Sequence, residues 1–173
     1  IGSSFLYDGQ PTDNRMTVGT PATGLQMISV GAYSTRATWD TGRGTWGAYS
    51  ASTFPAIVGD LAFFSSRGPS RDGRTLPTTS APGVGIISCL SSYARASYVG
   101  TTFEQFLVGP LDSGSYLAMQ GTSMSTPNCA GAIALALAVN HRLTPAQVRT
   151  CLTQSSRVDA FVLTRLRERL PVL

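Results

Sequence analysis

The chain has 173 residues, of which 42% are hydrophobic, which is enough for one domain with a core. Its net charge is +4 at pH 7, and all 13 basic residues are arginines scattered from Arg15 to Arg169. This scatter argues against nucleic acid as a partner. The longest apolar run has about eleven residues, too few to cross a bilayer, so no membrane partner is expected.

Three cysteines with no short spacing argue against a disulfide framework and against a zinc site. Cys129 lies in an apolar run and is expected to be a small core residue. We expect neither a metal ion nor a cofactor. The chain begins with Ile1 rather than Met, and its start lacks the charged and apolar segments of a signal peptide. The prediction is a cytoplasmic protein.

The first half of the chain predicts strands separated by turns. Residues 1–24 are rich in turn signals. Residues 27–33 are β-branched and alternating, which indicates a strand. Residues 34–56 are polar, aromatic and rich in glycine, and we interpret them as a long surface excursion. The apolar residues 57–64, around a Gly-Asp pair, could form a strand or the edge of one.

The second half predicts helices. Residues 84–88 read as a short strand, and residues 91–118 as loop or paired edge strands. A helix is expected from Ser123 to about Asn140. A second helix follows Thr144, which suits an N-cap because proline comes next and glutamine stands three residues on. Strands alternating with helices predict an α/β fold with a parallel sheet.

The most informative segment is 121–127, Gly-Thr-Ser-Met-Ser-Thr-Pro, which precedes an apolar run. It predicts a serine nucleophile, Ser123, at a helix N-terminus, where free N–H groups favour negative charge. Pro127 would suit the first helical turn. The alternative is that Thr122 or Ser123 only caps the helix. A serine nucleophile also needs a base, a group that orients this base, and donors for the oxyanion.

Segment 121–127 resembles the nucleophile motif of subtilisin-like serine peptidases. Residues 128–135 (Asn-Cys-Ala-Gly-Ala-Ile-Ala-Leu) are similar to the tripeptidyl-peptidase II branch of that family. Residues 17–33 are similar to the strand pair that flanks the family's specificity pocket. Residues 64–70 and 81–83 are similar to the turn before its last core strands.

The resemblance covers residues 9–155 and implies the C-terminal half of a doubly wound α/β domain with a Ser, His, Asp triad. We assign 1–155 to a partial peptidase domain and 156–173 to a divergent arginine-rich tail, in which 161–173 could form an amphipathic helix. In that family the histidine and the aspartate precede the serine. The implied substrate is a peptide or polypeptide.

Neither triad partner has a candidate in this chain. The one histidine, His141, follows Ser123 by eighteen residues, or about 27 Å along a helix. A base must lie within about 3 Å, so we expect His141 at the surface beyond the helix end. Asp60 and Asp112 are interpreted as turn or surface residues because the family keeps its aspartate elsewhere.

The resemblance also implies the residues that would bind the oxyanion and the substrate. The family's oxyanion asparagine follows a glycine shortly before the Thr-Val-Gly segment. Gln10 stands at that position here, and Asn14 is the other possible donor. Thr122 adds a hydroxyl beside the nucleophile. Gly19 and Thr20 are expected to line the specificity pocket.

Two functions remain open. The first is the nucleophile half of a serine peptidase whose histidine and aspartate lie upstream of Ile1, with that missing half or a second copy of the chain as partner. The second is a non-catalytic pseudo-peptidase that acts as a binding or scaffold subunit, favoured by Gln10, the distant histidine and the altered tail. Under either reading the chain by itself should be nearly inactive and should expose an unpaired sheet edge.

Overall fold

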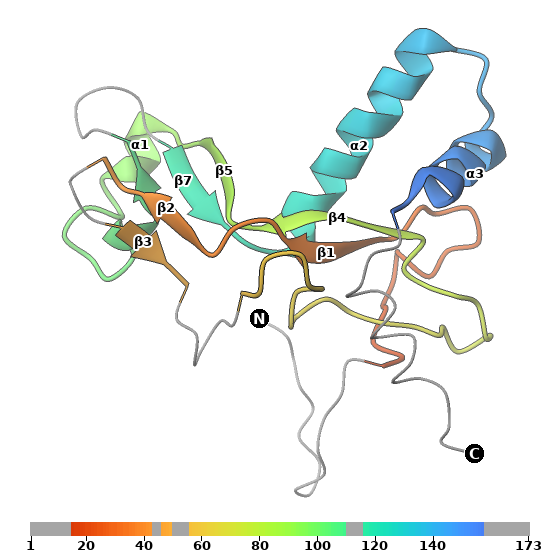
Figure 1. Ribbon diagram of the computed structural model, residues 1–173, viewed down its shortest axis with the longest axis horizontal. Coiled ribbons are helices and arrows are strands. Elements are labelled where there is room, and N and C mark those ends of the chain that lie inside the picture. Colours follow the sequence, from red (N-terminus) through yellow and green to blue (C-terminus); the bar gives the residue numbers. More distant parts are fainter. Residues whose placement is uncertain (1–14, 43–45, 50–55, 110–115, 158–173) are drawn as a thin grey trace, which may run out of the picture.

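The computed structural model describes residues 15–42, 46–49, 56–109 and 116–157. In chain order these residues form the strands and helices β1 (Val30–Ser34), β2 (Thr38–Asp40), β3 (Trp46–Ala48), β4 (Thr79–Val84), β5 (Ile86–Cys89), α1 (Ser92–Arg95), η1 (Glu104–Phe106), β6 (Leu107–Val108), β7 (Tyr116–Met119), α2 (Thr122–Val139) and α3 (Pro145–Ser155). Figure 1 shows two parts: a central layer of β1, β4 and α2, and an arm that carries β2, β3 and β5–β7.

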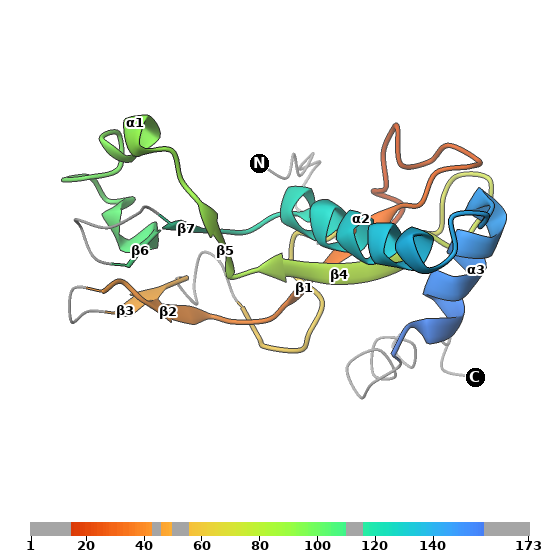
Figure 2. The same ribbon diagram turned by 90° about the horizontal axis from the view of Figure 1, so that it is seen from above.

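The central layer is built on a parallel pair of strands. β1 and β4 run in the same direction, from Val30 opposite Thr79 to Ser34 opposite Val84. α2 packs against this pair at its N-terminal end and rises away from it toward its C-terminal end, on the side that faces the viewer in Figure 2. Parallel strands covered by a helix are the unit of α/β proteins. The expected α/β fold is therefore confirmed.

Small residues allow α2 to approach β4 closely. There is no room for a side chain at Gly83, because a Cβ at this position would lie 2.2 Å from Ser125 Oγ and 2.5 Å from Ala32 Cβ. The Gly121 N–H donates a 2.8 Å hydrogen bond to the Gly83 carbonyl. The core around this contact consists of Ala32, Ala62 and Val84, with Tyr49, Ala56 and Phe64 packed against it. The position of the α2 N-terminus is thus fixed by backbone contact.

Replacing Gly83 with alanine should destabilise the full-length protein by about 1–3 kcal/mol, because the new methyl group overlaps buried atoms. Gly19→Ala is the control, since a Cβ there meets nothing within 4 Å, and it should change the free energy of unfolding by less than about 0.5 kcal/mol. Denaturant unfolding of both variants measures the difference. Equal stabilities would contradict the close approach of α2 and β4.

The arm differs from the expected surface excursion over 34–56. β2 and β3 pair as an antiparallel hairpin with Trp39 opposite Gly47. Trp39 is buried, and its indole N–H donates to the Gln105 carbonyl at 2.8 Å. The Trp39 ring meets the rings of Tyr49 and Phe106 at centroid distances of 5.0 and 5.8 Å. Burial raises the pKa of Tyr49 to about 12. The prediction was wrong because these aromatic residues form a small core of their own.

Two predicted strands are also shorter than expected. Gly85, with φ +72°, separates β4 from β5, so residues 84–88 do not form one strand. β5 instead joins a three-stranded antiparallel sheet in the order β5-β7-β6, which bears out the paired edge strands expected within 91–118. The segment 57–64 makes one isolated bridge, Leu61 to Tyr33, because a turn with Gly59 at φ +93° interrupts it.

Both long helices are confirmed. α2 ends at Val139, and α3 begins after Thr144 with a capping box in which Thr144 and Gln147 bond each other's backbone. Cys129 is 5% exposed, as expected of a core residue. No helix within the described ranges has the length and hydropathy needed to cross a bilayer. The helix expected over 161–173 lies outside the described residues.

Candidate active site

Ser123 is the second residue of α2 and is exposed. The N-cap is Gly121, at φ 149° and ψ 159°, a conformation that residues with a side chain rarely adopt. Neither Thr122 nor Ser123 caps the helix, since no side-chain hydrogen bond is made there. No hydrogen bond joins the Ser123 hydroxyl to another of the described residues. The capping alternative therefore does not account for Ser123.

Side chains of α2 fasten the turn below Ser123. The Asn128 amide donates to the Pro82 carbonyl at 3.2 Å and to the Met124 carbonyl at 2.9 Å. Ser125 is fully buried against Gly83. Burial also raises the pKa of the Cys129 thiol, which is consistent with a packing role. These contacts hold the exposed Ser123 on a rigid support.

Pro127 is not in the first turn, contrary to expectation. The helix begins at Thr122, which makes Pro127 an interior residue. Proline has no N–H, so it cannot donate to the carbonyl of Ser123 four residues earlier. The prediction failed because Thr122 and Ser123 enter the helix instead of capping it. The turn that carries Ser123 consequently has one backbone hydrogen bond fewer than an ordinary helical turn.

A cavity of about 210 Å³ opens beside this turn. Its wall includes Thr122 from α2 and four residues of the loop 18–22, two of which are Gly19 and Thr20. The structure therefore places three of the residues singled out in the sequence around one hollow. Space at Gly19 is open, since a Cβ there meets nothing within 4 Å. Their roles in binding stay predictions.

The cavity also has lining residues that the sequence did not single out. Ser29 and Val30 at the start of β1, Ser66 and Pro77 complete the wall with Val18 and Ala22. Ser29 and Val30 were assigned to a strand and, by the resemblance, to the strand pair that flanks the specificity pocket. Ser66 was assigned only to a turn motif. Nothing in the sequence pointed to Pro77 as a cavity residue. Its position there depends on the path that the loop 65–78 takes before β4 begins.

The structure does not bring a base or an acid to Ser123 among the described residues. His141 is exposed and lies beyond the C-terminal end of α2, at the opposite end from Ser123. Asp60 lies in a turn as expected, yet its side chain is 7% exposed and accepts the Leu61 N–H at 2.7 Å. Asp112, Asn14 and Gln10 lie outside the described residues.

Comparison with known proteins decides the family. The profile of the Subtilase family matches residues 9–168. The chain belongs to the subtilase family. This agrees with the resemblance that the motif at 121–127 carries. The role of Ser123 as the nucleophile stays a prediction.

Several relatives of this subtilase chain are much longer. Serine protease AprX of Bacillus subtilis is 35% identical over 144 residues, 83% of this chain and 28% of AprX. Pyrolysin of Pyrococcus furiosus is 36% identical over 121 residues, 69% of this chain and 7% of pyrolysin. Tripeptidyl-peptidase 2 of Caenorhabditis elegans is 31% identical over 145 residues, 81% of this chain and 9% of that protein. The chain thus spans a small part of these three relatives, whose identities do not single out one branch.

Proposed function

We propose that this chain is the nucleophile half of a subtilisin-like serine peptidase and that polypeptide upstream of Ile1 supplies the histidine and the aspartate. Ser123 Oγ would attack the carbonyl carbon of a peptide bond while the histidine takes its proton. The protonated histidine would then give that proton to the leaving amine. Water, deprotonated by the same histidine, would release the acyl group and restore the Ser123 hydroxyl.

One observation carries the proposal: Ser123 is exposed at the α2 N-terminus, and its neighbour Thr122 lines a cavity of about 210 Å³. The helix N-terminus favours the negative charge that develops on the substrate oxygen. We assign donors for this oxyanion to the Thr122 hydroxyl and, from the resemblance, to the Gln10 amide. Gly19 and Thr20 would contact the substrate side chain next to the cleaved bond.

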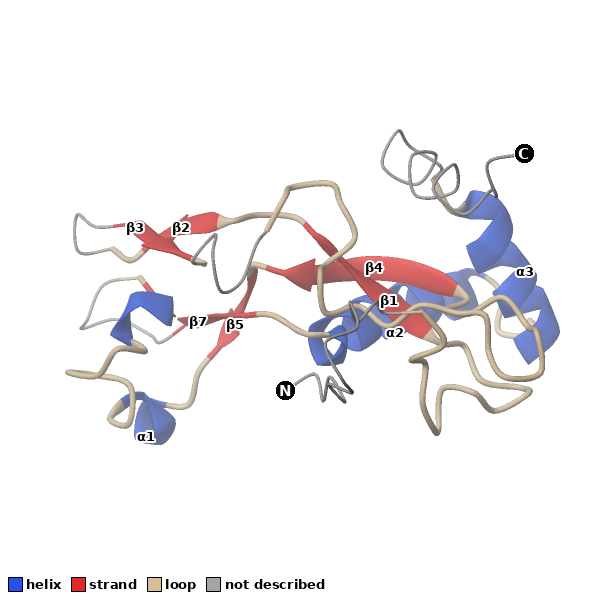
Figure 3. Cartoon of the chain, turned by 90° about the horizontal axis from the view of Figure 1, so that it is seen from below, coloured by secondary structure: helices blue, strands red, loops and turns tan. Residues whose placement is uncertain are grey.

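The same proposal includes a partner that covers the exposed apolar surface of α2. From Cys129 to Val139, α2 is apolar around its whole circumference, which is typical of a buried helix, yet only Ser125 and Cys129 on α2 are buried. Leu135 and Val139 are 72% and 90% exposed. Figure 3 shows α2 on the far face of the β1–β4 pair and, among the described residues, only loops on the near face. The missing upstream half, or failing that a second copy of the chain, would cover these surfaces.

The finer predictions concern product and location. We keep the prediction of a tripeptidyl-peptidase, which releases three residues from a free N-terminus, and that of a cytoplasmic protein. The latter is supported by three free cysteines, Cys89, Cys129 and Cys151, because reducing compartments keep thiols unpaired.

The coding sequence upstream of Ile1 gives the first test. An aspartate followed by a histidine in the same reading frame is the expected finding, and a stop codon there would favour the pseudo-peptidase. The full-length protein should then be incubated with peptides that have free or blocked N-termini. Mass spectrometry should detect tripeptides from the free peptides only; internal fragments would indicate an endopeptidase, and intact peptides would contradict the proposal.

A larger residue at Gly19 should change which substrates are cleaved. Gly19→Val would place two methyl groups in the open space beside the cavity. We expect kcat/KM to fall by about tenfold or more for a peptide with phenylalanine before the cleaved bond. The corresponding alanine peptide serves as the control and should be cleaved at nearly the original rate. An equal loss for both peptides would remove Gly19 from the specificity pocket.

A further inference from the structure

We propose that Arg74 and Asp72 position the cavity wall beside Ser123 and so determine how tightly large substrate side chains bind. Neither residue lines the cavity, and both would act through the loop 18–22. This inference rests on the proposed function of that cavity.

The loop is anchored on both sides of the segment that lines the cavity. On one side, the Thr17 N–H donates to the Arg67 carbonyl at 3.1 Å, and the Arg67 N–H donates to Thr17 Oγ1 at 3.3 Å. On the other side, Arg74 Nη2 donates to the Thr23 carbonyl at 2.6 Å. Residues 18–22 thus lie between two attachment points, and the second of these depends on the side chain of Arg74.

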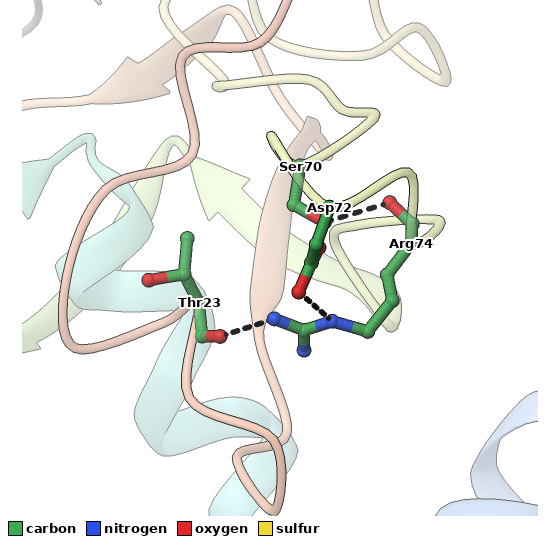
Figure 4. Close-up of polar contacts among 4 residues, drawn as sticks. All are labelled: Thr23, Ser70, Asp72 and Arg74. Atoms are coloured by element: carbon green, nitrogen blue, oxygen red, sulfur yellow. Dashed lines mark hydrogen bonds and ion pairs between the residues drawn. The ribbon is translucent and has the colours of Figure 1, made fainter.

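The guanidinium of Arg74 is itself oriented by a second set of contacts. Arg74 Nε donates to Asp72 Oδ2 at 2.8 Å, and the Ser70 hydroxyl donates to Asp72 Oδ1 at 2.6 Å. Figure 4 shows Asp72 between the Ser70 and Arg74 side chains, with the far end of the guanidinium turned toward Thr23. The hydrogen bonds from Ser70 and Arg74 lower the pKa of Asp72, so its carboxylate keeps its charge to a lower pH than an ordinary aspartate does. Ser70 is buried and also donates its N–H to the Arg74 carbonyl at 2.9 Å.

Arginine is the residue that these contacts require. Two different nitrogens of one planar group serve two partners, whereas the single nitrogen of lysine has no such fixed fork. The side chains of Arg74 and Asp72 are 33% and 52% exposed, and exposed ion pairs add little to global stability. The network therefore acts on the placement of the loop more than on the stability of the fold.

The test compares Arg74→Gln with Arg71→Gln in the full-length protein. Arg71 is exposed in the same turn and makes no hydrogen bond to the loop 18–22 or to Thr23 within the described ranges, which makes it a matched control. KM and kcat are measured for two peptides that differ only in phenylalanine or alanine before the cleaved bond. We expect Arg74→Gln to raise KM about tenfold for the phenylalanine peptide, with kcat and the alanine peptide little changed. Arg74→Lys should be intermediate.

Two results would overturn the inference: kinetics of Arg74→Gln that match those of Arg71→Gln, or an equal loss for both peptides. Should the unmodified protein cleave neither peptide, the proposed function fails, and hydrogen exchange then tests the positioning separately. The amides of residues 18–24 should exchange faster in Arg74→Gln than in Arg71→Gln. Equal exchange would show that Arg74 does not hold the loop.

Discussion

Replacing Ser123 with alanine in the full-length protein is expected to lower kcat by about a million-fold, because a triad that loses its nucleophile retains only binding and oxyanion stabilisation. KM should change little, since the hydroxyl group is exposed and makes no hydrogen bond within the described part of the chain. Peptide hydrolysis followed by mass spectrometry over long incubations provides the measurement.

Ser125→Ala is the matched control for this experiment. It is the same substitution two residues along α2, and it removes only a 3.5 Å hydrogen bond from the Ser125 hydroxyl to the Gly121 carbonyl. We expect kcat within about threefold of the original value, as for a weak contact whose loss costs less than 1 kcal/mol. A Ser123→Ala protein as active as the Ser125→Ala protein would show that the hydrolysis uses another nucleophile.

Placing aspartate at Leu135 should destabilise the full-length protein by about 3–5 kcal/mol, because a charge would be buried on the covered face of α2. In the isolated 173-residue chain the same side chain is 72% exposed, so the change there should cost less than about 0.5 kcal/mol and improve solubility. The same substitution is therefore expected to cause a large loss of stability in the full-length protein and almost none in the isolated chain. Denaturant unfolding and light scattering measure them.

Tyr93→Asp supplies the control for Leu135→Asp. Tyr93 is 91% exposed and lies in α1 on the arm, away from α2. Its replacement should leave both proteins nearly as stable as before. A Leu135→Asp protein that unfolds like Tyr93→Asp in the full-length form would mean that no polypeptide covers this part of α2.

Local signals in the sequence were sufficient for the two long helices and for the sharp turn that begins α2. The Thr144 N-cap with Gln147 three residues on predicted the start of α3, since both bonds of a capping box are formed within four residues. Gly121 before Ser123 indicated the sharp entry into α2, which needs a backbone conformation that only glycine adopts readily. Both features are encoded by neighbouring residues.

Features that depend on distant contacts were not predicted. Trp39 is covered in part by Gln105 and Phe106, which lie more than sixty residues further along the chain. The strand expected over 84–88 is divided at Gly85, where a Cβ would lie 2.1 Å from a side-chain atom of Arg36. Nothing in the sequence indicated the hydrogen bond from Arg74 to the Thr23 carbonyl, because the two residues are 51 positions apart. No local pattern encodes such contacts.

The central claim is that Ser123 becomes a nucleophile when upstream polypeptide supplies its base. Treatment with a fluorophosphonate, followed by peptide mapping, tests this most directly. We predict a covalent adduct on Ser123 in the full-length protein and none in the isolated 173-residue chain under the same conditions. A folded full-length protein that stays unmodified at Ser123, or that carries the adduct on another serine, would contradict it.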